Sequence, residues 1–241
     1  MAKTKRPFGL AGGPAIAALV LPAVLVGCST QTMSINDSSA PGGAVRATIR
    51  GAQGDSSRRL GAGVEFGYEA YRAKGTQQLQ AGETLQFQGT TYTGPQEMRH
   101  DAQLSQIYVA YNHRIGIGRY VELEPYVGVL HLQTKVRTFG TTAGVGLVSM
   151  NEGQSGVTAG LTPRVRFNER LAVELRYNIL HTRLRAFGTA YEAVAVLSPA
   201  EHVALRLGWG LRTHIVEDRS GVSSKLSVHS RGPVATLQFD F

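Results

Sequence analysis

Charged side chains that could form ion pairs or transfer protons recur at every second position of several segments. In residues 171–182, for example, Glu174 and Arg176 alternate with apolar residues. Paired carboxylates can act as general acid and general base, whereas a guanidinium beside a carboxylate forms a bidentate ion pair. Because acids and arginines occupy the same face of the pattern, we predict ion pairs rather than a catalytic site. The predicted set comprises Glu65, Glu69, Glu122, Glu124, Arg164, Arg166, Glu174, Arg176, Glu192, Arg206 and Arg212, and Asp240 shares their face.

Apolar residues occupy the positions between these charges. Alternation with a period of two is the pattern of a β-strand whose two faces meet different surroundings, and we find no helical period after residue 60. The apolar face lacks charged residues in every segment. The segments are 62–71, 104–114, 120–134, 156–167, 171–182, 188–198, 202–214 and 232–241. They predict an all-β fold.

The connections between these segments alternate between short and long. Short connections lie near residues 115–119, 168–170 and 199–201, and long ones at about 75–103, 135–155 and 215–231. Short turns on one side and longer loops on the other are typical of transmembrane barrels, whose strands need about 9–11 residues. We therefore predict that residues 60–241 form a closed antiparallel up-and-down transmembrane β-barrel of eight strands, with both chain ends on the side of the short turns.

Two further segments offer an alternative strand count. Residues 45–50 alternate like a short strand, and residues 84–88 could form another. Adding both gives ten strands, which is again an even number. We favour eight, because residues 79–83 break the alternation and a hairpin above the membrane would explain residues 79–92 equally well.

The first 27 residues have the layout of a secretory signal peptide, with three basic residues before a short apolar run. The run ends in Leu25-Val26-Gly27-Cys28, which resembles the lipobox of bacterial lipoproteins. This resemblance implies that Cys28 is acylated and becomes the new N-terminus, and Ser29 after it implies sorting to the outer membrane of a Gram-negative cell. Residues 28–59 are rich in small and polar residues, and we interpret them as a periplasmic tether.

The end of the chain, Leu237-Gln238-Phe239-Asp240-Phe241, resembles the terminal signal of outer-membrane barrels. The segment Leu123-Glu124-Pro125-Tyr126-Val127-Gly128 resembles a strand motif of the small eight-stranded superfamily of outer membrane protein A and its X-type relatives. The resemblance implies that Leu237, Phe239 and Phe241 are read by the barrel-assembly machinery. It also implies contact with outer-membrane lipid and lipopolysaccharide. The lipobox departs from most of that family.

The composition excludes several other classes of protein. The chain has 241 residues, of which 17% are charged, 29 are glycine and one is cysteine. A single cysteine excludes an intramolecular disulfide and a cysteine-rich zinc site. The net charge of +8 includes three charges of the signal peptide, which leaves 8 − 3 = +5. We predict no nucleic-acid partner, no metal and no cofactor.

The predicted role is structural or surface-interactive, as in an adhesin, with a barrel lumen plugged by the ion pairs. Long polar loops such as 75–103 could bind an extracellular ligand. The alternatives are a narrow porin-like channel and an enzyme that modifies lipid A, because lipid A deacylases use a His/Ser/Glu set on the outer barrel wall. His131 and His181 have the lipid-facing parity, but we find no serine beside His131 in the sequence. We therefore predict that the protein is not an enzyme.

Overall fold

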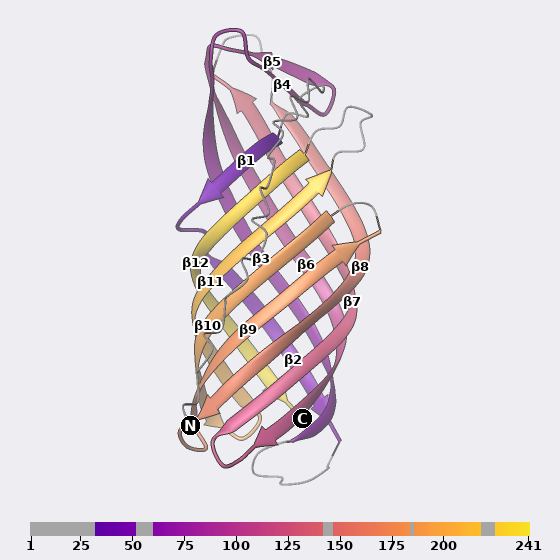
Figure 1. Ribbon diagram of the computed structural model, residues 1–241, viewed down its shortest axis with the longest axis vertical. Helices are drawn as coiled ribbons and strands as arrows, with labels where there is room; N and C mark the ends of the chain where they lie inside the picture. The colour runs from indigo at the N-terminus through magenta and orange to yellow at the C-terminus, as the bar shows by residue number, and fades with distance from the viewer. Residues whose placement is uncertain (1–31, 52–59, 142–146, 184–185, 218–224) are drawn as a thin grey trace, which may run out of the picture.

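The computed structural model describes residues 32–51, 60–141, 147–183, 186–217 and 225–241. The secondary structure of these residues consists of strands joined by turns (Figure 1). The strands are β1 (Thr32–Asp37), β2 (Gly42–Arg50), β3 (Gly61–Leu79), β4 (Thr84–Phe87), β5 (Thr90–Thr93), β6 (Gln96–Ile117), β7 (Val121–Gly140), β8 (Val148–Arg166), β9 (Leu171–Thr182), β10 (Ala186–Ala200), β11 (Val203–Glu217) and β12 (Lys225–Asp240). The predicted all-β fold is confirmed.

Nine strands form a closed ring in the order β2-β3-β6-β7-β8-β9-β10-β11-β12, with β12 pairing back onto β2. Neighbours are antiparallel except at this closure, where Thr236 pairs in parallel with Ala44. All eight predicted segments lie in ring strands. The ring takes in residues 45–50 as part of β2, but residues 84–87 form β4, which pairs with β5 in a separate hairpin. Neither the count of eight nor the count of ten is confirmed.

The ninth strand changes where the chain enters the ring. Strand β2 lies N-terminal to residue 60, the expected boundary, and runs in the same direction as β12. Strand β1 pairs in parallel with the other half of β12, with Thr32 opposite Lys225. The first described residue and Phe241 therefore lie at opposite ends of the ring. As predicted for residues 60–241, Gly61 and Phe241 both lie at the end that holds the short turns. The additional strand β2 brings the preceding chain in from the opposite direction.

The short turns gather at one end of the ring, as the sequence indicated. The Arg166 backbone N–H donates to the Tyr120 carbonyl at 2.7 Å, and the Asp240 N–H donates to the His202 carbonyl at 3.0 Å. Gly118 supports the turn between β6 and β7, since its φ of +67° belongs to the left-handed region. We call this end of the ring the lower end.

At the opposite end we expected long loops, but four strands continue through much of the sequence that we assigned to those loops. Strands β3, β6, β7 and β8 are 19, 22, 20 and 19 residues long, whereas β9 has 12. One side of the ring is consequently taller than the other, and the β4–β5 hairpin sits at its top (Figure 1). Residues 75–79, 96–103, 135–140 and 148–155 are strand rather than loop.

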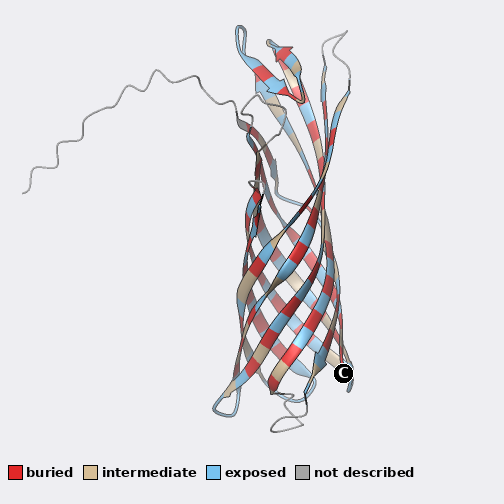
Figure 2. Cartoon of the chain, turned by 90° about the vertical axis from the view of Figure 1, so that its right-hand side faces the viewer, coloured by how far each residue is buried: buried red, intermediate tan, exposed pale blue. Residues whose placement is uncertain are grey.

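The outer surface changes character along the strands. Buried and exposed residues alternate along each strand (Figure 2). In the lower part the outward residues are apolar or small apart from His113, and in these described stretches no Asp, Glu, Lys or Arg stands at an outward position. We call this surface the apolar band. It comprises the outward residues of 43–49, 62–70, 107–117, 121–129, 157–165, 171–179, 191–197, 203–211 and 233–239.

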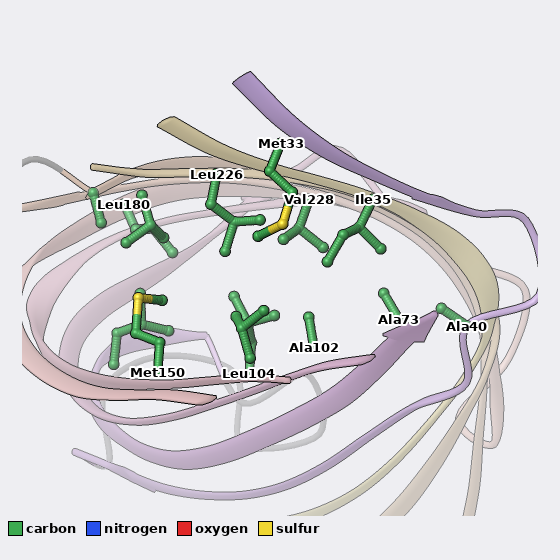
Figure 3. Packing of buried hydrophobic residues seen from close by; sticks show 14 of the residues in the cluster. Met33, Ile35, Ala40, Ala73, Ala102, Leu104, Met150, Leu180, Leu226 and Val228 are labelled. Carbon is green, nitrogen blue, oxygen red and sulfur yellow. The ribbon is translucent and has the colours of Figure 1, made fainter. Parts of the chain in front are cut away.

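Above the apolar band the same strands form what we call the upper extension, together with β1 and the β4–β5 hairpin. Most of its outward residues are polar or charged, as Arg72, Lys74 and Lys135 show, although Phe139 and Phe187 are also exposed there. Its interior is an apolar cluster that includes Met33 and Ile35 of β1 and Leu104 of β6 (Figure 3). The hairpin contributes Leu85, Phe87 and Tyr92 to the same cluster. The upper extension therefore has an ordinary hydrophobic core.

Candidate functional site

The interior of the lower part holds the predicted charged residues. Because side chains alternate across a strand, the residues between those of the apolar band must point into the ring. Glu122, for instance, is 1% exposed, between Val121 and Leu123. All eleven predicted residues take part in ion pairs, and their side chains are at most 14% exposed. We describe these pairs as three tiers, from the upper extension downward.

The first tier joins four strands around Glu192 of β10. One carboxylate oxygen of Glu192 lies 2.7 Å from Arg212 Nη2, and the other lies 3.5 Å from Arg46 Nη2. Arg46 also donates to Glu69 Oε1 at 2.7 Å, and Gln106 donates to the second oxygen of Glu69 at 2.9 Å. The ion pairs of this tier link β2, β3, β10 and β11 across the lumen, and Gln106 adds a hydrogen bond from β6.

The second tier combines an ion pair with two tyrosines. Arg176 Nη2 lies 3.2 Å from Glu65 Oε1, and the Tyr108 hydroxyl donates to the same oxygen at 2.7 Å. The guanidinium of Arg176 also lies 4.4 Å from the centroid of the Tyr126 ring, within the range of a cation–π interaction. Gly67 makes this packing feasible, because a Cβ there would lie 2.2 Å from the Tyr108 ring.

The third tier lies nearest the lower end and has two parts. In the first, Arg50 and Arg114 both donate to Glu124 Oε2, at 2.8 and 2.6 Å. Arg50 also donates to Asn112 Oδ1 at 2.9 Å. Two arginines on different strands thus share one carboxylate.

The second part of this tier is a chain of alternating charges. Arg206 forms an ion pair with Glu174, and Arg164 Nη1 lies 3.5 Å from the other oxygen of Glu174. Arg164 Nε lies 3.7 Å from Glu122, and Arg166 Nη2 lies 3.0 Å from the same residue. The chain crosses from β11 through β9 and β8 to β7. Its chemistry is electrostatic cross-linking of strands around this side of the ring.

Three arginines of this lumen were missed in the sequence analysis. Arg46 and Arg50 lie in β2, in a segment that we interpreted as a tether, and Arg114 lies at the end of its strand. They raise the number of lumen arginines from five to 5 + 3 = 8, against seven acids. The parity of residues 45–50 contained the signal, since Arg46 and Arg50 alternate there with apolar residues.

Two histidines are buried inside the upper extension. His100 Nδ1 lies 3.1 Å from Thr138 Oγ1, and burial lowers the pKa of His100 to about 4. The ring of His214 is hydrogen-bonded to the Tyr71 hydroxyl. Burial, together with the charge of Arg212, lowers the pKa of His214 to about 3. Both imidazoles are therefore neutral at pH 7.

On the outer surface, His131 lies beside a serine of the next strand. His131 of β7 is opposite Ser155 of β8, and His131 Nδ1 lies 3.1 Å from Ser155 Oγ. The expectation that no serine lies beside this histidine was wrong, because cross-strand register cannot be seen in a single segment. His181 is also outward and exposed.

The remaining predicted residues belong to the two ends of the chain. Leu237 and Phe241 point outward, with exposed fractions of 37% and 64%, and the Phe241 ring stacks on His202 at a centroid distance of 6.0 Å. Cys28 and the predicted signal peptide lie outside the described residues. In the part of the chain that the structure describes, no group of three or more His, Cys, Asp or Glu residues could hold a metal ion. Among the same residues, no helix is long and apolar enough to cross a membrane.

Comparison of the chain with models of protein families, with curated proteins and with solved structures found no match.

Proposed function

We propose that the protein is an integral β-barrel of a Gram-negative outer membrane with a structural or surface-interaction role. The observation that supports this most strongly is the apolar band. Its exposed residues include Phe66, Tyr111, Leu175 and Trp209 from four different strands. The largest apolar patch on a soluble monomer covers only about 300–600 Å², whereas this band continues around all nine ring strands.

The dimensions of the apolar band fit a bilayer. Its stretches run over residues 107–117 in β6, 121–129 in β7 and 203–211 in β11, which is close to the roughly 9–11 residues of a tilted transmembrane strand. At a rise of about 3.3 Å per residue and a tilt of about 45°, ten residues span about 23 Å. The apolar belt of outer-membrane barrels is about 25 Å tall.

The interior supports a plugged barrel. Charged groups inside a membrane protein face the protein interior and pair with one another, as the three tiers do. Directly above them the apolar cluster fills the ring, from Leu132 and Met150 up to the hairpin residue Tyr92. A channel is the alternative, and a recess of about 470 Å³ at the lower end, lined by Arg114, Arg164 and Arg166, would be its mouth. The tiers lie between this recess and the upper extension.

The upper extension supports the surface-interaction role. With Phe241 on the periplasmic side, the extension and the β4–β5 hairpin project outward from the cell. In this arrangement Leu237, Phe239 and Phe241 lie at the periplasmic end, where the assembly machinery would read them, and the apolar band contacts lipid and lipopolysaccharide. Acylation of Cys28 and the absence of enzymatic activity remain predictions.

Gel migration of the membrane fraction tests the proposal. We expect the protein in the outer-membrane fraction, and we expect unboiled and boiled samples to migrate differently, because a closed barrel resists detergent until it is heated. Recovery in the soluble fraction, or equal mobility of both samples, would contradict the proposal. Conductance in planar bilayers separates the two kinds of barrel: discrete steps that change in Arg176→Gln would overturn the plugged lumen in favour of the channel.

A further inference from the structure

The apolar band contains a groove of about 780 Å³ that crosses five strands, from β2 to β8. Two rows of paired residues line it. The upper row runs from Val45 through Tyr68, Ile107 and His131 to Ser155, each residue opposite the next on the neighbouring strand. The lower row runs from Ala47 through Phe66 and Val109 to Val129. The groove therefore lies across the strands rather than along them.

Because the groove crosses the strands, one of its ends lies within the apolar band and the other lies at the upper edge of the band. Val45 lies within the band on β2, and Ile107 is the uppermost band residue on β6. His131 and Ser155 stand one outward position above Val129 and Val157, the last band residues of β7 and β8. One end of the groove is therefore apolar, and the other is polar and lies at the level where a bilayer meets water.

The polar end offers hydrogen-bond donors and a positive charge. His131 and Ser155 lie 3.1 Å apart. The neighbouring Gly153 leaves the His131 ring uncovered, because a Cβ there would lie 2.9 Å from its Nε2. One row further up, Gln133 donates to Asn151 at 3.3 Å. Lys135, two outward positions above His131 and just outside the groove lining, is on the same face and is exposed.

Lys135 is an exposed cation near the polar end of the groove. The structure records no ion pair of Lys135 with the residues that it describes, in contrast to Arg72, which binds Asp101 through Nε at 2.7 Å. A hydroxyl, an imidazole and an ammonium group on one outward face are donors that suit a phosphate. Basic side chains at the membrane surface also attract anionic lipids.

We propose that this groove binds one phospholipid of net negative charge from the membrane. Its acyl chain lies along the two apolar rows, and its phosphate is held at the polar end by His131, Ser155 and Lys135. The inference rests on the proposed membrane insertion and adds a ligand to it. A zwitterionic phospholipid would bring its own cation close to Lys135, and a free phosphate would leave the apolar rows empty, so both should bind less well.

Native mass spectrometry of the purified full chain in detergent tests the proposal, with phosphatidylglycerol, phosphatidylcholine and inorganic phosphate as probes. We expect one phosphatidylglycerol to stay bound after excess lipid is removed, with phosphatidylcholine retained at least fivefold less and inorganic phosphate not retained. Ala47→Phe fills the groove and should reduce phosphatidylglycerol occupancy at least fivefold. Ala195→Phe, at an outward band position of β10 outside the groove, is the matched control and should leave occupancy unchanged.

A second pair of variants tests the phosphate contact. Lys135→Gln should abolish the preference for phosphatidylglycerol over phosphatidylcholine, while Lys225→Gln, at an exposed lysine of β12, should keep it. Equal occupancy in Ala47→Phe and the wild type, or the same loss in both alanine variants, would overturn the site. Flotation with vesicles is measured in parallel: a wild-type chain that does not float refutes membrane insertion, whereas a chain that floats but retains no lipid refutes only the groove.

Discussion

The lower part of the ring and the upper extension have opposite polarity, although the same strands build both. Along β3, Phe66 and Tyr68 point outward and Glu65 points inward in the lower part. A few residues later Arg72 points outward and Ala73 inward. The backbone alternation is unchanged across this point, and only the chemistry of the two faces is exchanged.

This exchange supports the proposed membrane insertion, in which the two parts would meet different solvents. An apolar interior beneath a charged surface is the arrangement that water imposes. A charged interior beneath an apolar surface is stable only where the outside is itself apolar. Paired charges then have a lower free energy inside the ring than in contact with hydrocarbon. The inversion on nearly every long strand falls at one level, which fits a single membrane surface crossing the molecule.

The largest expected effect is in the charged lumen. Glu192→Ala removes the carboxylate that Arg46 and Arg212 share and leaves two buried guanidinium groups with fewer partners. Breaking a buried ion pair costs about 3–5 kcal/mol. Glu97→Ala is the control, because its pair with Arg99 is exposed and such pairs contribute less than about 1 kcal/mol. Urea unfolding of the refolded protein in phospholipid vesicles measures both, and similar losses would show that the lumen pairs are solvated.

The apolar interior of the upper extension should respond to a cavity. Leu104 is 1% exposed in the cluster, and Leu104→Ala should lower the free energy of unfolding by about 2–5 kcal/mol. Leu207→Ala on the apolar band should cost less than about 1 kcal/mol, since fluid lipid can occupy the space that it vacates. The same unfolding measurement applies, and an equal cost at both positions would indicate that the band is packed against protein rather than lipid.

Much of this architecture could be predicted from the sequence, but only where an apolar outer face alternates with a polar or charged inner face. The alternation of apolar and charged residues located all eight segments and every charged lumen residue on them apart from Arg114. It failed where polarity inverts: in 75–79, Thr76 and Gln78 face outward, so a search for an apolar outer face interpreted a strand as a loop. The pairing of His131 with Ser155 depends on the register of two strands, which no single segment encodes.

A charge placed on the apolar band tests the level of the inversion directly. Leu175 lies near the middle of the band on β9 and is 57% exposed. Leu175→Arg should destabilise the inserted protein by about 2–4 kcal/mol, as arginine does at the midplane of a bilayer. Asn151→Arg, at an outward position of the upper extension, should change stability by less than about 0.5 kcal/mol. If the two variants behave alike in vesicles, the band does not lie in lipid.

The smallest effect is a pH dependence confined to the upper extension. His100 and His214 have folded pKa values of about 4 and about 3, below the value of about 6.5 in an unfolded chain. Between these values the unfolded chain binds more protons than the folded chain, so stability is complete above pH 6.5 and falls as the pH decreases. From pH 7 to pH 5.5 each histidine should cost about 1 kcal/mol. His100→Gln should remove half of this dependence, whereas His181→Gln, whose side chain is exposed, should retain it all, and an unchanged slope in His100→Gln would show that this imidazole reaches water.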